Sequence, residues 1–148
     1  MFKISHALAL TFVTVLGVTS RTAAQTPQTT QTPPAPHLVV VRLVERGGSA
    51  PYAFEPATVQ VEHGDTLRFL EAVDVPHNIH FTKEPSGAKL GSAGTGPYLV
   101  SKGQKYDLVI DSRFTDGVYT FVCDPHEMLG MRGSLTVVTE SAMKTAGK

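Results

Sequence analysis

The sequence predicts an all-β fold, an antiparallel β-sandwich, and three observations lead to that prediction. Short segments with the composition or the alternation of β-strands recur along the chain and are separated by turn residues. The 148 residues include 13 Gly and 10 Pro, many of them at segment boundaries. No segment keeps the period of an amphipathic helix. A series of short strands of this kind is typical of two antiparallel sheets packed face to face.

The first 24 residues are typical of a secretory signal peptide. Lys3 gives the positive start, residues 7–18 are mostly apolar, and the small residues Ala23 and Ala24 precede the expected cleavage point. We therefore predict an exported protein, soluble in the periplasm or another extracytoplasmic compartment. An uncleaved anchor is the less favoured alternative, because the apolar run is too short to span a bilayer.

The rest of the chain divides into a tether, one domain and a tail. Residues 25–36 (QTPQTTQTPPAP) have almost no apolar side chains and cannot contribute to a core, so we predict an extended tether. The domain covers residues 37–140, and residues 141–148 form a polar tail. The strands expected within the domain are residues 38–44, 58–62, 66–70, 77–82, 106–111, 118–123 and 133–138. A Gly-rich loop, residues 88–96, lies between the fourth and fifth of them.

Charge and cysteine content limit the classes of function that the chain could have. The 13 basic and 13 acidic residues balance, and no basic patch suggests a nucleic-acid partner or a polybasic membrane surface. Cys123 is the only cysteine, although exported domains usually pair theirs. A lone cysteine outside the cytoplasm is either a reactive thiol or an occupied one, and coordination to a metal would protect it from oxidation.

Three residues near the C-terminus have the chemistry of a copper site. Cys123, His126 and Met131 place a thiolate, an imidazole and a thioether within nine residues, between two expected strands. This ligand set suits copper, and two histidines, one cysteine and a weak axial methionine make a blue-copper site. Such a site needs a second histidine.

His77 is the best candidate for that histidine. Alternation places His77 on the same face of its strand as Ile79, and Cys123 on the same face as Phe121, so both point to the core. Each lies at a strand end, so we expect the two to meet at one end of the sandwich. His80 falls on the opposite face and is the poorer candidate.

The motifs around these residues resemble those of the plastocyanin–pseudoazurin group of cupredoxins. The resemblance covers roughly residues 54–138. It implies a cupredoxin-like, Greek-key sandwich of about seven to eight strands. The motifs are Phe54-x-Pro56, Val61-x-x-Gly64-Asp65-Thr66-Leu67-x-Phe69, Pro76-His77-Asn78 and Gly117-x-Tyr119-x-Phe121-x-Cys123-x-Pro125-His126-x-x-x-x-Met131-x-Gly133.

The resemblance implies a role for each residue of the site. One copper ion, cycling between Cu(I) and Cu(II), would be held by His77, Cys123 and His126 as equatorial ligands and by Met131 as the long axial one. Asn78 would hydrogen-bond around the ligands and hold the loop. Asp124 could bond Asn78 or simply be solvated, and the sequence does not choose between the two.

The resemblance also implies how electrons leave the site. His126 would present an exposed ring edge among apolar residues such as Pro76, Pro125 and Leu129, where redox partner proteins dock. Met128 would belong to the same rim. We expect a monomer with no substrate and no nucleic-acid partner. Plastocyanins carry a Tyr where this chain has Val122, and no acidic run lies nearby, so a plant-type photosynthetic partner is not expected.

Three alternatives stay open. Met128 competes with Met131 as the axial ligand, although its spacing from His126 fits neither pattern known in cupredoxins. A copper enzyme is disfavoured, because the other domain histidines His37, His63 and His80 form no His-x-His pair. A copper-handling protein, for delivery or storage, is the main alternative to a one-electron carrier.

Overall fold

Apolar side chains alternate along the strands, and this alternation builds the interior of the protein. The computed structural model describes residues 35–139, which belong to one compact unit. In β4 (Thr66–Glu71), Leu67 and Phe69 point inward, as Val59 and Val61 do in β3 (Thr58–Glu62). The strands are β1 (Leu38–Glu45), β2 (Tyr52–Glu55), β3 (Thr58–Glu62), β4 (Thr66–Glu71), β5 (His80–Lys83), β6 (Lys105–Val109), β7 (Gly117–Val122) and β8 (Arg132–Val138).

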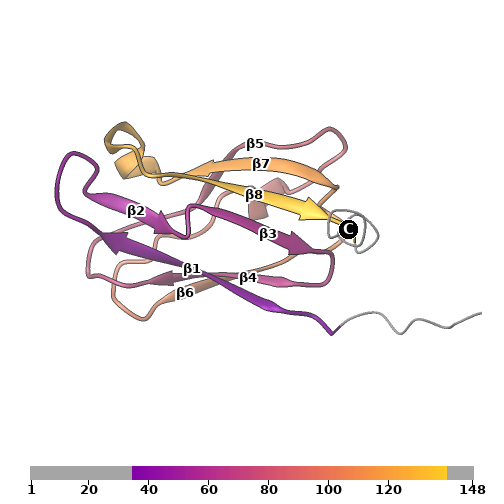
Figure 1. Cartoon of the computed structure of the whole chain (residues 1–148), viewed down its shortest axis with the longest axis horizontal. Coiled ribbons are helices and arrows are strands. Elements are labelled where there is room, and N and C mark those ends of the chain that lie inside the picture. The colour runs from indigo at the N-terminus through magenta and orange to yellow at the C-terminus, as the bar shows by residue number, and fades with distance from the viewer. Residues whose placement is uncertain (1–34, 140–148) are drawn as a thin grey trace, which may run out of the picture. The chain divides into compact units, whose positions relative to one another are not determined.

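The strands form two four-stranded sheets that face each other (Figure 1). One sheet has the order β2-β1-β4-β6 and the other β3-β8-β7-β5. The predicted all-β sandwich is confirmed, but the sheets are mixed: β1 pairs with β4, and β3 with β8, in parallel. Parallel neighbours arise here because the chain changes sheet between β2 and β3 and again between β3 and β4, so strands not consecutive in sequence become adjacent.

Two strands differ from the sequence prediction. Strand β2, between Pro51 and Pro56, was not predicted because its four residues are too few to show a period. The segment expected to start at residue 77 becomes a regular strand only at His80. His77 instead forms an isolated bridge with Leu99, through backbone hydrogen bonds of 2.9 and 2.8 Å. The backbone at His77 is thus held in place by a segment distant in sequence.

Three phenylalanines join the two sheets. The ring centroid of Phe121 in β7 lies 4.9 Å from that of Phe54 in β2 and 5.4 Å from that of Phe69 in β4. A β-carbon at Gly133 would overlap the Phe121 ring, so glycine is required where β8 passes this cluster. The cluster is the rigid support from which the loop after β7 projects.

The Gly-rich segment covers part of this core. Its short 3-10 helix η1 (Gly91–Gly94) follows the buried Leu90, and the Tyr106 hydroxyl donates to the Ala93 carbonyl at 3.2 Å. A β-carbon at Gly96 would lie 2.9 Å from the Tyr106 ring. Glycine therefore lets this segment pack closely over β6.

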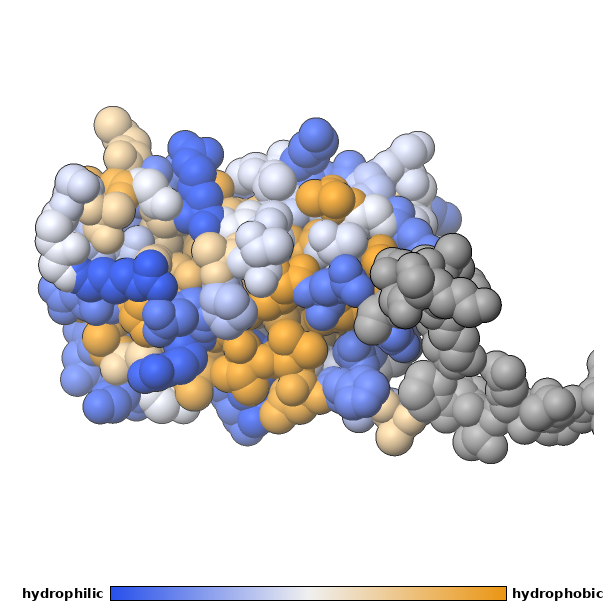
Figure 2. All heavy atoms as spheres, viewed as in Figure 1, coloured by the Kyte–Doolittle hydropathy of each residue, from blue (hydrophilic) through white to orange (hydrophobic). Residues whose placement is uncertain are grey.

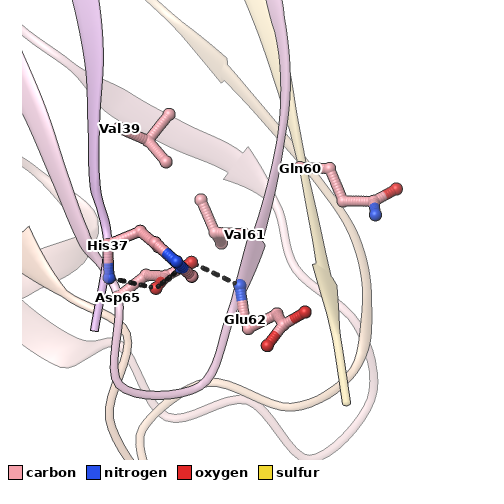
Figure 3. A pocket seen from close by; sticks show the side chains of 6 residues that line it. All are labelled: His37, Val39, Gln60, Val61, Glu62 and Asp65. Atoms are coloured by element: carbon pink, nitrogen blue, oxygen red, sulfur yellow. Dashed lines mark hydrogen bonds and ion pairs between the residues drawn. The ribbon is translucent and has the colours of Figure 1, made fainter. Parts of the chain in front are cut away.

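The two ends of β4 carry different polar groups. At its start, the buried carboxylate of Asp65 accepts hydrogen bonds from the backbone N–H groups of His37 and Glu62, each at 2.8 Å (Figure 3). These residues, with Val39 and Val61, line a small pocket. At the other end of β4 lies Glu71, beside the segment that carries His77. Within the described residues, no helix is long and apolar enough to cross a membrane.

Candidate metal centre

His77 is completely buried and offers one nitrogen without a partner. Its Nδ1 lies 2.9 Å from Oε2 of Glu71, whereas its Nε2 has no hydrogen-bond partner. No other buried side-chain nitrogen or oxygen among residues 35–139 lacks a partner in this way. A buried polar atom without a partner costs free energy, about 1–3 kcal/mol. A metal ion bound at Nε2 would remove that cost.

The other predicted ligands lie in one tight loop between β7 and β8. Cys123 follows β7, the 3-10 helix η2 (Asp124–Leu129) carries His126, and Met131 precedes β8. The backbone N–H of Met131 donates to the His126 carbonyl at 3.1 Å, and that of Cys123 to the Met131 carbonyl at 3.2 Å. Gly130 closes the loop with φ of +88°, a conformation that favours glycine.

The fold brings three of the four predicted ligands close together. Sγ of Cys123 lies 3.4 Å from Nδ1 of His126, and the ring centroids of His77 and His126 are 4.8 Å apart. Their side chains are not arranged in the geometry of a formed metal site, because no group of three or more His, Cys, Asp or Glu in residues 35–139 has that geometry. The unpartnered His77 nitrogen and the soft donor set nevertheless fit a copper ion.

The two candidate axial methionines differ sharply in burial. Met131 is fully buried and hydrogen-bonded through its backbone to both Cys123 and His126. Met128 is 98% exposed, on the surface of η2. A fully exposed thioether cannot contribute to a site whose other sulfur is buried, so Met131 is the better candidate.

The surroundings of Cys123 favour its protonated form in the absence of a metal. Burial raises the pKa of the Cys123 thiol, and the nearby charges of Asp124 and Glu71 raise it further. Hydrogen bonds from the backbone N–H groups of Asn78 and His126 lower this pKa, but they do not outweigh burial. Binding of a metal would therefore displace a proton from Cys123.

The surroundings of His126 favour its neutral form. Partial burial lowers the pKa of this imidazole, and the neighbouring His77 lowers it further. The neutral ring is the form that binds metals.

Asn78 ties the two halves of the site together. Its side-chain Nδ2 donates to Oδ2 of Asp124 at 2.6 Å, and its Oδ1 accepts from the Asp124 backbone N–H at 2.8 Å. Asp124 therefore bonds Asn78 rather than only water. Its Oδ1 also lies 2.8 Å from Nδ1 of His80. The Asn78 amide, followed by His80, lowers the pKa of Asp124.

Two residues at the site were not found from the sequence. Tyr52 in β2 lies against both histidines, with its ring centroid 4.0 Å from that of His126 and 5.4 Å from that of His77. No sequence signal pointed to it, because β2 was not predicted. Glu71 continues the alternation of the inward-facing Leu67 and Phe69, and that pattern could have identified it as buried.

Comparison with known proteins identifies the family. The profile described as "Copper binding proteins, plastocyanin/azurin family" matches residues 39–138, more than half of the chain. The chain belongs to the plastocyanin/azurin family. The family binds copper, and this implies one copper ion per chain.

Members of the plastocyanin/azurin family are similar to this chain in sequence and in fold. Plastocyanin of Scenedesmus fuscus is 35% identical over 101 residues, which are 67% of this chain and 98% of that protein. A mutant fern plastocyanin is similar in structure, with a TM-score of 0.55, 29% identity and coverage of 68% of this chain and 100% of that one. Pseudoazurin from Methylobacterium extorquens AM1 has a TM-score of 0.50 and 28% identity, and the match covers 75% of this chain and 85% of that one.

Proposed function

We propose that this protein is a one-electron carrier whose copper is bound by His77, Cys123, His126 and Met131. The observation that carries the proposal is the buried, unpartnered Nε2 of His77 beside the thiol and imidazole of the β7–β8 loop. The bound copper would supply one-electron chemistry by changing between Cu(II) and Cu(I).

The protein's part is to hold the donors and to exclude water. His77, Cys123 and Met131 are each fully buried, and backbone hydrogen bonds fix all four residues in the metal-free chain. Donors that are fixed in advance change little when an electron arrives or leaves, which keeps the barrier to transfer low. Four protein donors also leave no open position for a substrate, unlike most catalytic metal sites. Binding and release of a substrate are therefore not part of the proposed function.

Electrons would enter and leave through the ring edge of His126. Its ring is only partly buried. Three exposed apolar residues lie within three positions of it in the sequence, Pro125, Met128 and Leu129, and a fourth, Pro76, directly precedes His77. We call these four residues the rim. Figure 2 shows apolar side chains at the end of the molecule where the loop between β7 and β8 lies. Redox partner proteins would dock on the rim, with the chain acting as a monomer.

Export remains part of the proposal. The predicted signal peptide (residues 1–24), most of the tether (25–36) and the tail (141–148) lie outside the described residues. The proposed location is periplasmic or otherwise extracytoplasmic. N-terminal sequencing of the protein recovered from the periplasm would test it, and an N-terminus at Gln25 is the expected result.

Visible absorption of the purified protein tests the proposed function. After addition of Cu(II), we expect an intense blue colour that ascorbate bleaches and ferricyanide restores, and that the Cys123→Ser variant lacks. A colourless protein with copper bound would mean that Cys123 is not an equatorial ligand, and copper handling would then be the better explanation. Rapid loss of Cu(I) to a competing chelator would also favour copper delivery over electron transfer.

A further inference from the structure

Glu71 is a buried carboxylic acid in contact with His77, and the proposed ligand set does not include it. It is the last residue of β4 and only 1% exposed. Its Oε2 faces Nδ1 of His77 at 2.9 Å, and its Oε1 accepts the backbone N–H of Val73 at 3.2 Å. A buried carboxyl group is costly unless hydrogen bonds or charges compensate it, so its presence here calls for an explanation.

The contacts of Glu71 favour one tautomer of His77, with the ring proton on Nδ1. The Val73 N–H can only donate, so Oε1 is an acceptor. Oε2 likewise accepts if Nδ1 of His77 carries the proton, which leaves both oxygens of an ionised carboxylate satisfied. The imidazole then has its hydrogen on Nδ1 and a free lone pair on Nε2, the atom that lacks a partner. The carboxylate would contact Nδ1 of the imidazole and the metal would bind Nε2 on the other side of the ring, as at many metal-bound histidines.

We propose that Glu71 is a positioning residue that fixes the ring and tautomer of His77 and whose buried charge stabilises the oxidised over the reduced form of the bound copper. The inference rests on the proposed function. A negative charge favours the more positive ion, and low exposure keeps solvent from screening it.

A purely structural role for Glu71 makes a different prediction. Its backbone joins β4 to the turn before β6, with its N–H donating to the Gln104 carbonyl at 2.9 Å and its carbonyl accepting from Gly103 at 2.8 Å. These bonds survive any side-chain substitution. The variant Glu71→Gln keeps them and the side-chain shape. It removes the charge and replaces one accepting oxygen of the carboxylate by an NH₂ donor. If Glu71 were merely structural, this variant would change stability without changing the reduction potential.

The test is an equilibrium redox titration of the copper-loaded full-length protein, followed by its blue absorption. We expect Glu71→Gln to increase the equilibrium constant for reduction about tenfold, which is about 59 mV for one electron. The matched control is Glu127→Gln, which removes the same charge beside His126, where the carboxylate is 40% exposed and paired with Arg132. The control should shift that constant less than about threefold, because water screens the charge.

The outcomes separate this inference from the proposed function. A blue Glu71→Gln protein whose potential matches wild type, or shifts no more than the control, overturns the role of Glu71 and leaves the electron-carrier proposal intact. A wild-type protein that is not blue overturns the proposed function itself. Should Glu71→Gln fail to fold, NMR of the wild-type Cu(I) protein decides: we expect a downfield His77 ring N–H that exchanges slowly with solvent. A ring N–H that exchanges freely overturns the inference.

Discussion

The two histidines of the site have opposite surroundings. His77 is fully buried, its backbone is bridged to Leu99, and its ring faces the carboxylate of Glu71. His126 sits on a short 3-10 helix, is only partly buried, and has its ring against Tyr52. The ring of the first histidine is thus hydrogen-bonded to a buried carboxylate, whereas the ring of the second packs against a half-buried tyrosine.

We infer from this difference that the two imidazoles have different roles. A ligand fixed in the interior can set the geometry and the electrostatics of the metal, because nothing outside the protein reaches it. In the proposed function, the histidine at the surface passes the electron to a partner, because its ring edge lies beside the rim. Variants of the two histidines and of the residues that contact them test whether the two differ in this way.

The largest expected effect comes from removing each ring in turn. His77→Gly and His126→Gly should both abolish the blue absorption of the copper-loaded protein. Added imidazole should restore it in His126→Gly, where the vacated space opens to solvent, but not in His77→Gly, where the position is sealed. Titration with imidazole at constant copper, followed in the visible range, measures this. Equal rescue of both variants would contradict the comparison.

Asn78 joins the His77 segment to the His126 loop, and its loss should be the next largest effect. Asn78→Ala removes two hydrogen bonds to Asp124, one of them to its carboxylate. We expect the free energy of unfolding of the metal-free protein to fall by about 2–3 kcal/mol. Urea denaturation measures it. The control His80→Gln alters a bond to the same carboxylate from an exposed side chain and should cost about 0–1 kcal/mol.

Tyr52 should matter less, and mainly through its ring. Tyr52→Leu keeps an apolar side chain but loses the contact with the His126 ring at 4.0 Å. Such aromatic pairs contribute about 0.5–1.5 kcal/mol, so we expect the unfolding free energy to fall by that amount. Tyr52→Phe, which keeps the ring, should lie closer to wild type. Equal losses in both variants would show that the hydroxyl, not the stacking, is what stabilises.

The smallest effect on stability should come from the rim. Met128 is almost fully exposed, so Met128→Ser should change the unfolding free energy by no more than about 0.5 kcal/mol and leave the visible spectrum unaltered. It should nevertheless slow electron transfer to a redox partner, measured by stopped-flow mixing. Val109→Ser changes an exposed apolar residue on β6 and serves as the control. If both variants slowed transfer equally, docking at the rim would be contradicted.

Much of the site could be predicted because its information is local. Cys123, His126 and Met131 lie within nine residues between two strands, so one tight loop is enough to bring their side chains together. Alternation in β3 and β4 also predicted correctly which valines, leucines and phenylalanines face the core. The same alternation placed His77 inward, although the residue lies just before the regular strand.

The contacts that distinguish the two histidines could not be predicted in the same way. Tyr52 reaches the site only because β2 pairs with the end of β1. Leu99 forms a bridge with His77 although the two residues are far apart in the sequence, and a local pattern cannot predict such a contact. The parallel pairing of β1 with β4 likewise depends on the route of the chain between sheets.

The sequence by itself determined the family and the strand faces, and it supplied the candidate donors that we propose, because these depend on residue type and short spacing. Only the tertiary structure decided that one histidine faces a buried carboxylate and the other an aromatic ring at the surface. Those partners come from distant parts of the chain, and long-range pairing is settled by the packing of the whole sandwich.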